Sequence, residues 1–182
     1  MQFLLTTRDP YNANYCTPEG QVIYKVVSPF QFRNRKATID KVAPSPTGAE
    51  DLQDHFERIG EVQFNTIKHS ILTYKNVSQS VDKFFRKKAS WVNLGSHRIF
   101  TGPDGKEYRW KVANTKPVLY TNDEAQTHVA KFHQQDIISI TPKAKAATLE
   151  IYPAGEHMVD LIVVTLVYIE KLRRDRERAA AA

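Results

Sequence analysis

Residues 158–178 read MVDLIVVTLVYIEKLRRDRER, and this stretch decides the fold. Four polar or charged residues interrupt an otherwise apolar run from Met158 to Leu172: Asp160, Thr165, Glu170 and Lys171. Apolar side chains therefore face every direction around a helix in its first half. Such a helix either spans a membrane or is enclosed by protein on all sides.

Length argues against the membrane. A membrane span needs roughly 20 consecutive apolar residues. The unbroken apolar part, Leu161–Ile169, is much shorter, contains Thr165 and directly follows Asp160. An aspartate at membrane depth would cost roughly 3 kcal/mol. The stretch therefore predicts a buried core segment.

The same run is rich in β-branched residues, which favour a strand. Its continuation, residues 170–178, consists mostly of strong helix formers and leads into alanines. Glu170 can also pair with Arg173 or Arg174 one helical turn later. We therefore predict one helix over residues 157–178, with its first half buried and its second half in solvent.

Composition places the chain among ordinary globular proteins. Its 182 residues predict one domain over residues 1–182, and the net charge of +6 owes much to the C-terminal cluster of basic residues. Cys16 is the sole cysteine, so an intramolecular disulfide is impossible, which fits a reducing compartment. Residues 1–10 resemble no signal peptide. We expect a cytoplasmic protein, with nuclear or peripheral membrane location as alternatives.

Short segments with strand-like alternation fill most of the chain before residue 157, separated by turns about every 8–12 residues. The strongest is residues 97–112, HRIFTGPDGKEYRWKV, in which two alternating runs flank Pro103–Gly105 and predict a hairpin. Residues 80–88 predict one short helix with Ser80 as its N-cap and a basic outward face. Residues 44–55, rich in proline and acidic side chains, predict an exposed loop.

The helix and the strands constrain one another. A helix that is apolar on every side cannot lie on one face of an open sheet without exposing its far side. A closed sheet around the helix removes both that exposed side and the unpaired strand edges. We therefore predict a mainly β (α+β) fold: a closed antiparallel β-barrel of about ten to twelve strands that encloses the hydrophobic C-terminal helix.

Three motifs carry a resemblance to a known family. They are a Gly-Gln-x-x-Tyr strand at Gly20–Tyr24, a Pro-Asp-Gly-x-x-Tyr-x-Trp hairpin at Pro103–Trp110, and an aspartate-led hydrophobic helix ending in Glu-x-Leu-Arg-Arg at Asp160–Arg174. With these motifs nearly the whole chain resembles a group of fungal proteins known only as a domain of unknown function. That group is similar to the tubby C-terminal, LURP-one-related and phospholipid-scramblase superfamily.

The resemblance implies a barrel around a hydrophobic C-terminal helix. Tubby domains bind phosphoinositide headgroups, but their basic site has no residue-by-residue match in this chain, so no site residue is transferred. The calcium motif and the cysteine-rich stretch of scramblases have no counterpart here, which argues against scramblase activity.

The sequence shows no catalytic constellation. Its six histidines lack the spacing of metal ligands, and Cys16 has no neighbouring motif that would activate a thiol. Nucleophile-elbow, P-loop and Rossmann glycine patterns do not occur. We expect Asp160 to accept hydrogen bonds at one end of the barrel rather than to act as an acid or base. The sequence therefore predicts no catalytic residue, no metal, no cofactor and no enzyme.

The outward basic side chains of the predicted short helix and of the predicted hairpin form the candidate anion-binding set: Lys83, Arg86, Lys87, Lys106, Arg109 and Lys111. Cations beside aromatic rings could hold a phosphate or a stacked base. Strand alternation, however, places Tyr108 and Trp110 on the opposite face from Arg109 and Lys111, so nucleic acid is the weaker alternative. The sequence does not fix whether the two basic segments adjoin.

Three functions stay open. The first is a non-enzymatic intracellular module that binds an anionic membrane lipid headgroup, such as a phosphoinositide, or a protein partner through its basic outer surface. The second is a small-ligand binder or enzyme with a pocket at the barrel mouth, although a barrel filled by a helix leaves little room. The third is a structural or assembly protein that uses the arginine-rich tail as an interaction arm.

Overall fold

The computed structural model describes residues 1–29, 35–43, 55–65, 69–88, 97–112, 116–134 and 147–181. Within these ranges the chain forms thirteen strands, two α-helices and one 3-10 helix. The strands are β1 (Gln2–Leu5), β2 (Ala13–Cys16), β3 (Val22–Val27), β4 (Arg35–Val42), β5 (Phe56–Phe64), β6 (Ile71–Tyr74), β7 (Val77–Ser80), β8 (Arg86–Lys88), β9 (His97–Thr101), β10 (Glu107–Lys111), β11 (Val118–Thr121), β12 (His128–His133) and β13 (Thr148–Ile151). The helices are α1 (Val81–Phe84), the 3-10 helix η1 (Pro153–Met158) and α2 (Val159–Ala180).

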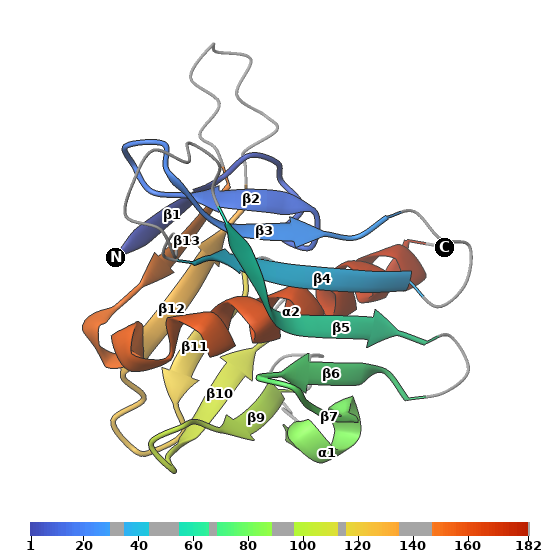
Figure 1. Ribbon diagram of the computed structural model, residues 1–182. Coiled ribbons are helices and arrows are strands. Elements are labelled where there is room, and N and C mark those ends of the chain that lie inside the picture. Colours follow the sequence, from blue (N-terminus) through green and yellow to red (C-terminus); the bar gives the residue numbers. More distant parts are fainter. Residues whose placement is uncertain are drawn as a thin grey trace.

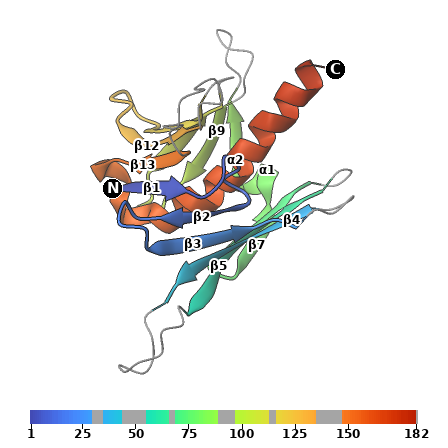
Figure 2. The same cartoon turned by 90° about the horizontal axis from the view of Figure 1, so that it is seen from above.

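The strands form one antiparallel sheet in the order β7-β6-β5-β4-β3-β2-β1-β13-β12-β11-β10-β9-β8 (Figure 1). Neighbours in space are mostly neighbours in sequence, as expected for hairpins. The exception is the pairing of the first strand with the last, with Phe3 opposite Leu149. This pairing joins the two ends of the meander, so that the sheet rolls around α2 (Figure 2).

The prediction of a closed barrel of ten to twelve strands is wrong in its closure and its count. Strands β7 and β8 stand at the two ends of the thirteen-strand order, and the pairing among the described residues does not join them. The turn of helix α1 separates these strands in the chain. Val81 of α1 and Phe85 just after it are buried, and the Phe85 ring stacks on Tyr168 of α2 at 5.4 Å between centroids. Side-chain packing therefore covers α2 here.

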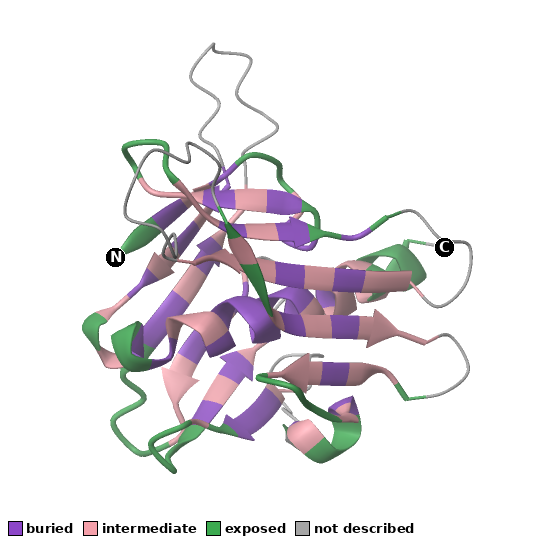
Figure 3. Ribbon diagram, viewed as in Figure 1, coloured by how far each residue is buried: buried purple, intermediate pink, exposed green. Residues whose placement is uncertain are grey.

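The apolar half of α2 is buried in this rolled sheet, as the sequence predicts (Figure 3). Its enclosure is tight, because a Cβ added to Gly60 of β5 would lie 2.6 Å from Val164 Cγ2. The Thr165 hydroxyl accepts a hydrogen bond from Trp110 Nε1 (3.1 Å) and donates to the Leu161 carbonyl (2.8 Å). The polar group in the middle of the apolar stretch is thus satisfied, as burial requires.

The predicted hairpin and helices can be compared with the elements that the structure contains. The hairpin is confirmed as β9 and β10, and Gly105 adopts φ +78° in its turn. The helix predicted over residues 80–88 is wrong in length: α1 ends at Phe84, and Arg86–Lys88 instead pair with β9 as β8. The C-terminal helix begins and ends two residues later than predicted. Residues 44–54 of the predicted loop lie outside the described residues.

Candidate functional site

A polar cluster occupies the N-terminal end of α2. Asp160, in the first turn, accepts hydrogen bonds at Oδ1 from the Tyr24 hydroxyl (2.6 Å) and from Lys41 Nζ (2.8 Å). Strand pairing brings the two donors together, because Tyr24 on β3 lies directly opposite Lys41 on β4. The expectation that Asp160 is a hydrogen-bond acceptor at the end of the sheet is confirmed.

The phenols of this cluster are held in their protonated form. Burial raises the pKa of Tyr24 far above its ordinary value, and the hydrogen bond to Asp160 raises it further. Burial and the negative charge of Asp160 also raise the pKa of Tyr74 on β6. A tyrosine in this state donates a hydrogen bond and supplies no nucleophile or base. The cluster therefore presents fixed polar contacts.

A pocket of about 690 Å³ opens around this cluster. Its volume falls in the range of small-molecule sites, roughly 300–1,000 Å³. The apolar part of its wall comes from Phe3, Pro18, Ile23, Met158 and Val159, and the polar part includes Tyr24, Lys41, Tyr74, Lys75 and His157 together with the acidic side chains of Glu19, Glu156 and Asp160. The expectation that a helix-filled barrel leaves little room is thus wrong at this end, because α2 begins only at Val159.

Two lysines stand at this pocket. The Lys41 side chain is 40% exposed, whereas that of its partner Asp160 is 23% exposed, so the lysine is the more accessible member of this ion pair. Lys75 occupies the tight turn between β6 and β7, where it and Asn76 have φ values of +47° and +63°. This turn type fits a two-residue hairpin. The turn places Lys75, the second exposed cation, beside the pocket.

A second polar cluster fixes η1 next to the pocket. The Tyr108 hydroxyl donates to Asp104 Oδ2 (2.8 Å), and His157 Nε2 lies 3.3 Å from the Tyr108 oxygen and 3.6 Å from Asp104 Oδ2. Burial works against ionisation of Asp104, but the hydrogen bond from Tyr108 and the neighbouring groups lower its pKa overall. The tip of the β9–β10 hairpin is thereby tied to η1.

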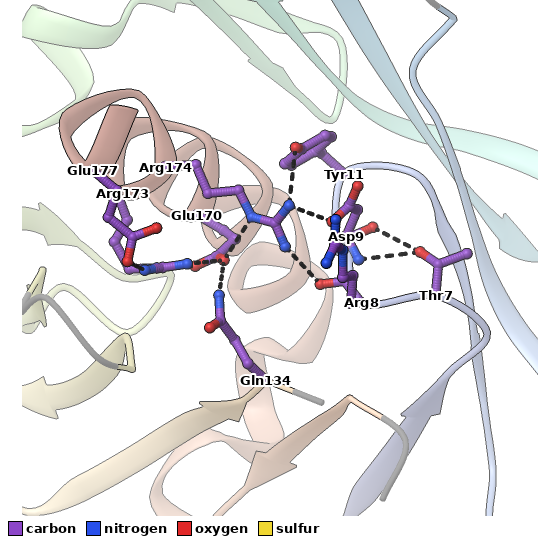
Figure 4. A network of polar contacts seen from close by, with 9 residues as sticks. All are labelled: Thr7, Arg8, Asp9, Tyr11, Gln134, Glu170, Arg173, Arg174 and Glu177. Carbon is purple, nitrogen blue, oxygen red and sulfur yellow. Dashed lines mark hydrogen bonds and ion pairs between the residues drawn. The ribbon is translucent and has the colours of Figure 1, made fainter. Parts of the chain in front are cut away.

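The opposite half of α2, which was predicted to lie in solvent, instead carries a buried ionic network (Figure 4). Glu170 is fully buried and accepts hydrogen bonds from Gln134 Nε2 (2.7 Å), Arg173 Nε (2.8 Å) and Arg174 Nε (3.2 Å). The predicted pairing of Glu170 with Arg173 or Arg174 is confirmed, and both arginines take part. The charges satisfy one another within the protein.

Arg174 extends this network to the segment after β1. Its Nη2 donates to the Arg8 carbonyl (2.9 Å), its Nη1 lies 3.4 Å from the Tyr11 hydroxyl, and it forms an ion pair with Asp9 (Figure 4). These contacts fasten the N-terminal segment to the far end of the helix. The network is therefore a clamp within the fold.

Acidic neighbours accompany half of the six predicted anion-binding residues. The pairs are Arg86 with Glu107 (2.7 Å), Lys87 with Asp82 (2.6 Å) and Lys106 with Asp104 (3.9 Å). The basic segments do adjoin, because Arg86 on β8 and Arg109 on β10 both lie opposite Ile99 of β9.

The remaining members of the set differ in their surroundings. Lys83 is exposed on α1. Arg109 Nη2 and Lys111 Nζ both donate to Gln126 Oε1, at 2.8 and 3.3 Å. Because that acceptor is neutral, their positive charges are not cancelled by it. The binding of an anion by the whole set stays a prediction.

Lys41 and Tyr74 were not singled out by the sequence. The signals available were the aspartate that opens the apolar helix and the Tyr24 of the early strand, but their meeting depends on strand register. Among the described residues, no group of histidine, cysteine or acidic side chains could hold a metal ion. Over the same ranges, no helix is long and apolar enough to cross a membrane.

Comparisons with known proteins give a family and no activity. The family described as "Family of unknown function (DUF6593)" matches residues 8–175. No curated protein matches the chain. Among solved structures, an X-ray structure of a protein from Arabidopsis thaliana is similar over 94% of this chain and 90% of that chain, with 15% sequence identity and a TM-score of 0.36. A likeness at this score supports no argument about fold or function.

Proposed function

Because this chain belongs to the DUF6593 family, whose description states no function, we propose from geometry that it is a non-enzymatic binding module for a small anionic amphiphile. The ligand would occupy the pocket at the N-terminal end of α2. One observation carries the proposal: a pocket of about 690 Å³ that combines an apolar wall with Lys41, Lys75 and the Tyr24–Asp160 pair.

The wall of the pocket combines two kinds of surface. Met158, Phe3 and Ile23 provide an apolar surface for a hydrocarbon chain or ring. Lys41 and Lys75 provide positive charge for a carboxylate or phosphate. Such a combination of apolar lining with a few placed polar groups is typical of small-molecule sites.

Binding fits the cluster better than catalysis does. The pKa of Tyr24 is raised by burial, so the phenol remains a neutral donor. Asp160 Oδ1 is already occupied by Tyr24 and Lys41. A catalytic acid or base needs a proton that it can exchange near neutral pH. These side chains instead hold one another in place.

This proposal keeps the expected anionic lipid headgroup as the ligand class but moves its site from the outer basic set to the pocket. We further propose that the fold is related to the tubby C-terminal, LURP-one-related and scramblase superfamily and that the chain is fungal. The rolled sheet around a C-terminal helix and the hairpin motif Pro103–Trp110 support this relation. An intracellular location, at a membrane surface where anionic amphiphiles occur, is supported by the single cysteine, Cys16.

The test compares ligands with one chain length and different headgroups. Dodecyl phosphate and dodecyltrimethylammonium are titrated below their micelle concentrations, with binding followed by calorimetry and by the melting temperature. We expect dodecyl phosphate to bind and to raise the melting temperature, and the ammonium compound to do neither. Equal binding of both compounds, or binding of neither, would refute the proposal.

A matched pair of variants locates the site. Lys75→Asn removes the charge at the pocket and retains a residue type that tolerates positive φ. Lys83→Gln removes one charge from α1, which follows the opposite end of the β6–β7 hairpin. We expect Lys75→Asn to weaken dodecyl phosphate binding severalfold and Lys83→Gln to leave it unchanged. The reverse order would place the anion on the outer basic set.

A further inference from the structure

The outer face of the sheet carries a row of aromatic rings from two strands and from the end of a third. Tyr120 lies on β11, His128 on β12, and Tyr152 directly after β13. The ring centroids of Tyr120 and His128 are 4.5 Å apart, and those of His128 and Tyr152 are 5.6 Å apart, both in edge-to-face arrangement. We call these three residues the ring row. His128, at its centre, is exposed.

Cations of the same outer face stand next to the ring row. Strand pairing places Arg109 of β10 opposite Tyr120, and Tyr120 opposite His128. In the neighbouring line across the strands, Lys111 and Lys131 both lie opposite Val118. Three cations from two strands therefore flank the rings.

One of these cations already shows how a ligand could bind. Lys111 Nζ lies 4.1 Å from the centroid of the Tyr120 ring, in a cation–π contact. A lysine side chain is flexible, so a flat ring that stacks on Tyr120 can take the place of the ammonium. The ammonium is then free to meet a negative group of the same ligand.

Two carboxylates border the ring row, one bound to a cation and one bound to the ring row itself. Glu107 accepts hydrogen bonds from Arg86 at both carboxylate oxygens (2.7 and 2.8 Å). Glu150, which lies opposite Lys131, accepts a hydrogen bond from the Tyr152 hydroxyl (3.0 Å) and lies 3.3 Å from His133 Nε2. Within the described part of the chain, Arg109 and Lys111 by contrast share a neutral acceptor, Gln126 Oε1. Positive charge therefore remains beside the rings.

A hollow continues the row beyond Tyr152. It has a volume of about 990 Å³ and lies along β1, β12 and β13. Tyr152, His133, Gln2 and Lys116 are among the residues that line it. The hollow adds a fourth cation, Lys116, together with the carboxylate of Glu150 and further hydrogen-bonding groups beside the ring row. A ligand longer than one ring can thus extend from Arg109 across the sheet.

We propose that this face binds single-stranded nucleic acid, with bases stacked on the ring row and phosphates at Arg109, Lys111 and Lys131. Stacking surfaces flanked by cations are the physical basis of binding to single strands without sequence preference. A double helix would present its bases only at their edges, which leaves the rings without a stacking partner. The proposal does not depend on the pocket at α2.

Fluorescence anisotropy with a labelled 12-nucleotide single-stranded RNA of mixed sequence tests this binding. We expect saturable binding at 50 mM salt that weakens at higher salt, with a slope of log K against log salt of about −2 for three phosphate contacts. His128→Ala should weaken binding about tenfold through lost stacking. Lys111→Gln should weaken binding and make the slope shallower by about 0.7.

A matched control exists elsewhere on the sheet. Lys25 Nζ lies 3.8 Å from the centroid of the Phe56 ring, so Lys25→Gln removes the same charge from the same kind of contact. We expect it to leave RNA binding unchanged, with circular dichroism confirming that all variants fold. The proposal is overturned if the RNA does not bind at 50 mM salt, or if Lys25→Gln acts like Lys111→Gln. Binding to anionic vesicles but not to RNA, lost in His128→Ala, would assign the face to membranes instead.

Discussion

The Glu170→Gln variant tests whether the buried network holds the C-terminal half of α2 in place. Glutamine keeps the shape of the side chain and one acceptor oxygen but removes the negative charge. Arg173, only 3% exposed, and Arg174, 14% exposed, then lose the carboxylate that they share. Removing one partner of a buried ion pair costs about 3–5 kcal/mol, because the other charge is left in a poorly solvated place.

The structure favours the lower end of that range. Arg173 retains an ion pair with Glu177, and Arg174 retains one with Asp9. We therefore expect the free energy of unfolding to fall by about 3 kcal/mol. With a urea dependence of about 2 kcal/mol per M, the midpoint of urea unfolding would fall by about 1.5 M.

The control is the ion pair of Lys171 and Asp175 on the same helix, in which the Asp175 side chain is about half exposed. Asp175→Asn should cost about 0.3–0.5 kcal/mol, as is usual for exposed pairs one turn apart. Urea unfolding followed by circular dichroism and by tryptophan fluorescence measures both variants and checks that the two transitions coincide. If Glu170→Gln costs no more than Asp175→Asn, the network is not a clamp and the reasoning from burial fails.

Three further predictions concern the core and its pH dependence. Gly60→Ala should destabilise the protein by about 1–3 kcal/mol through overpacking against Val164 Cγ2, and Val164→Ala should relieve part of that loss in the double variant, as measured by urea unfolding. Thr165→Val should cost about 1–3 kcal/mol by leaving Trp110 Nε1 without its acceptor, with a shift of the tryptophan emission as a second readout. Burial raises the pKa of Tyr24 and Tyr74 in the folded state, so their contribution to stability is complete below about pH 10 and is lost as the pH rises further. Unfolding free energies measured from pH 8 to 11 should therefore decline at the alkaline end, less steeply in Tyr24→Phe; an unchanged slope would contradict the role given to burial.

Local physics was sufficient to predict the element at the centre of the fold. The apolar run, its charged continuation and the Glu170–Arg174 spacing predicted the helix to within two residues at each end. The same reasoning predicted the hairpin, since alternation and a turn with Gly105 act over a few residues. These features depend on contacts close in sequence. They can therefore be recognised from the sequence alone.

The two edge strands of the sheet, β7 and β8, could not be recognised from the sequence in this way. Strand β7 reads VSQS, which has only one apolar residue, and Val77 is 64% exposed. The basic run after α1 resembled a helix, yet Arg86–Lys88 form β8 because β9 offers them backbone partners. Pairing with a distant strand thus overrode local propensity. Closure of the barrel, predicted from the need to cover the helix, depends on these same edges.

Neither proposed site could be predicted from the sequence, for a related reason. Lys41 reaches Asp160 only because β3 and β4 pair with Tyr24 opposite Lys41. The ring row gathers side chains from β11, from β12 and from the residue after β13, whereas alternation along β10 concerns only the rings of that strand. Tyr108 and Trp110 are indeed buried, as alternation predicted, but neighbouring strands supply rings to the charged face. The register of strand pairing decides which side chains meet across a sheet, and a single sequence does not specify that register.

A ligand in the pocket would add to the stability of the whole fold independently of the network around Glu170. Asp160 and Glu170 lie ten residues apart on one helix, which corresponds to about 15 Å along its axis. Changes at sites this far apart, with no shared partner, usually add in free energy. A ligand that binds only the folded state at 100 times its Kd adds about 2.7 kcal/mol. That gain is close to the loss expected when Glu170 is neutralised, so the pocket at one end of α2 can offset a weakened clamp at the other without any contact between them.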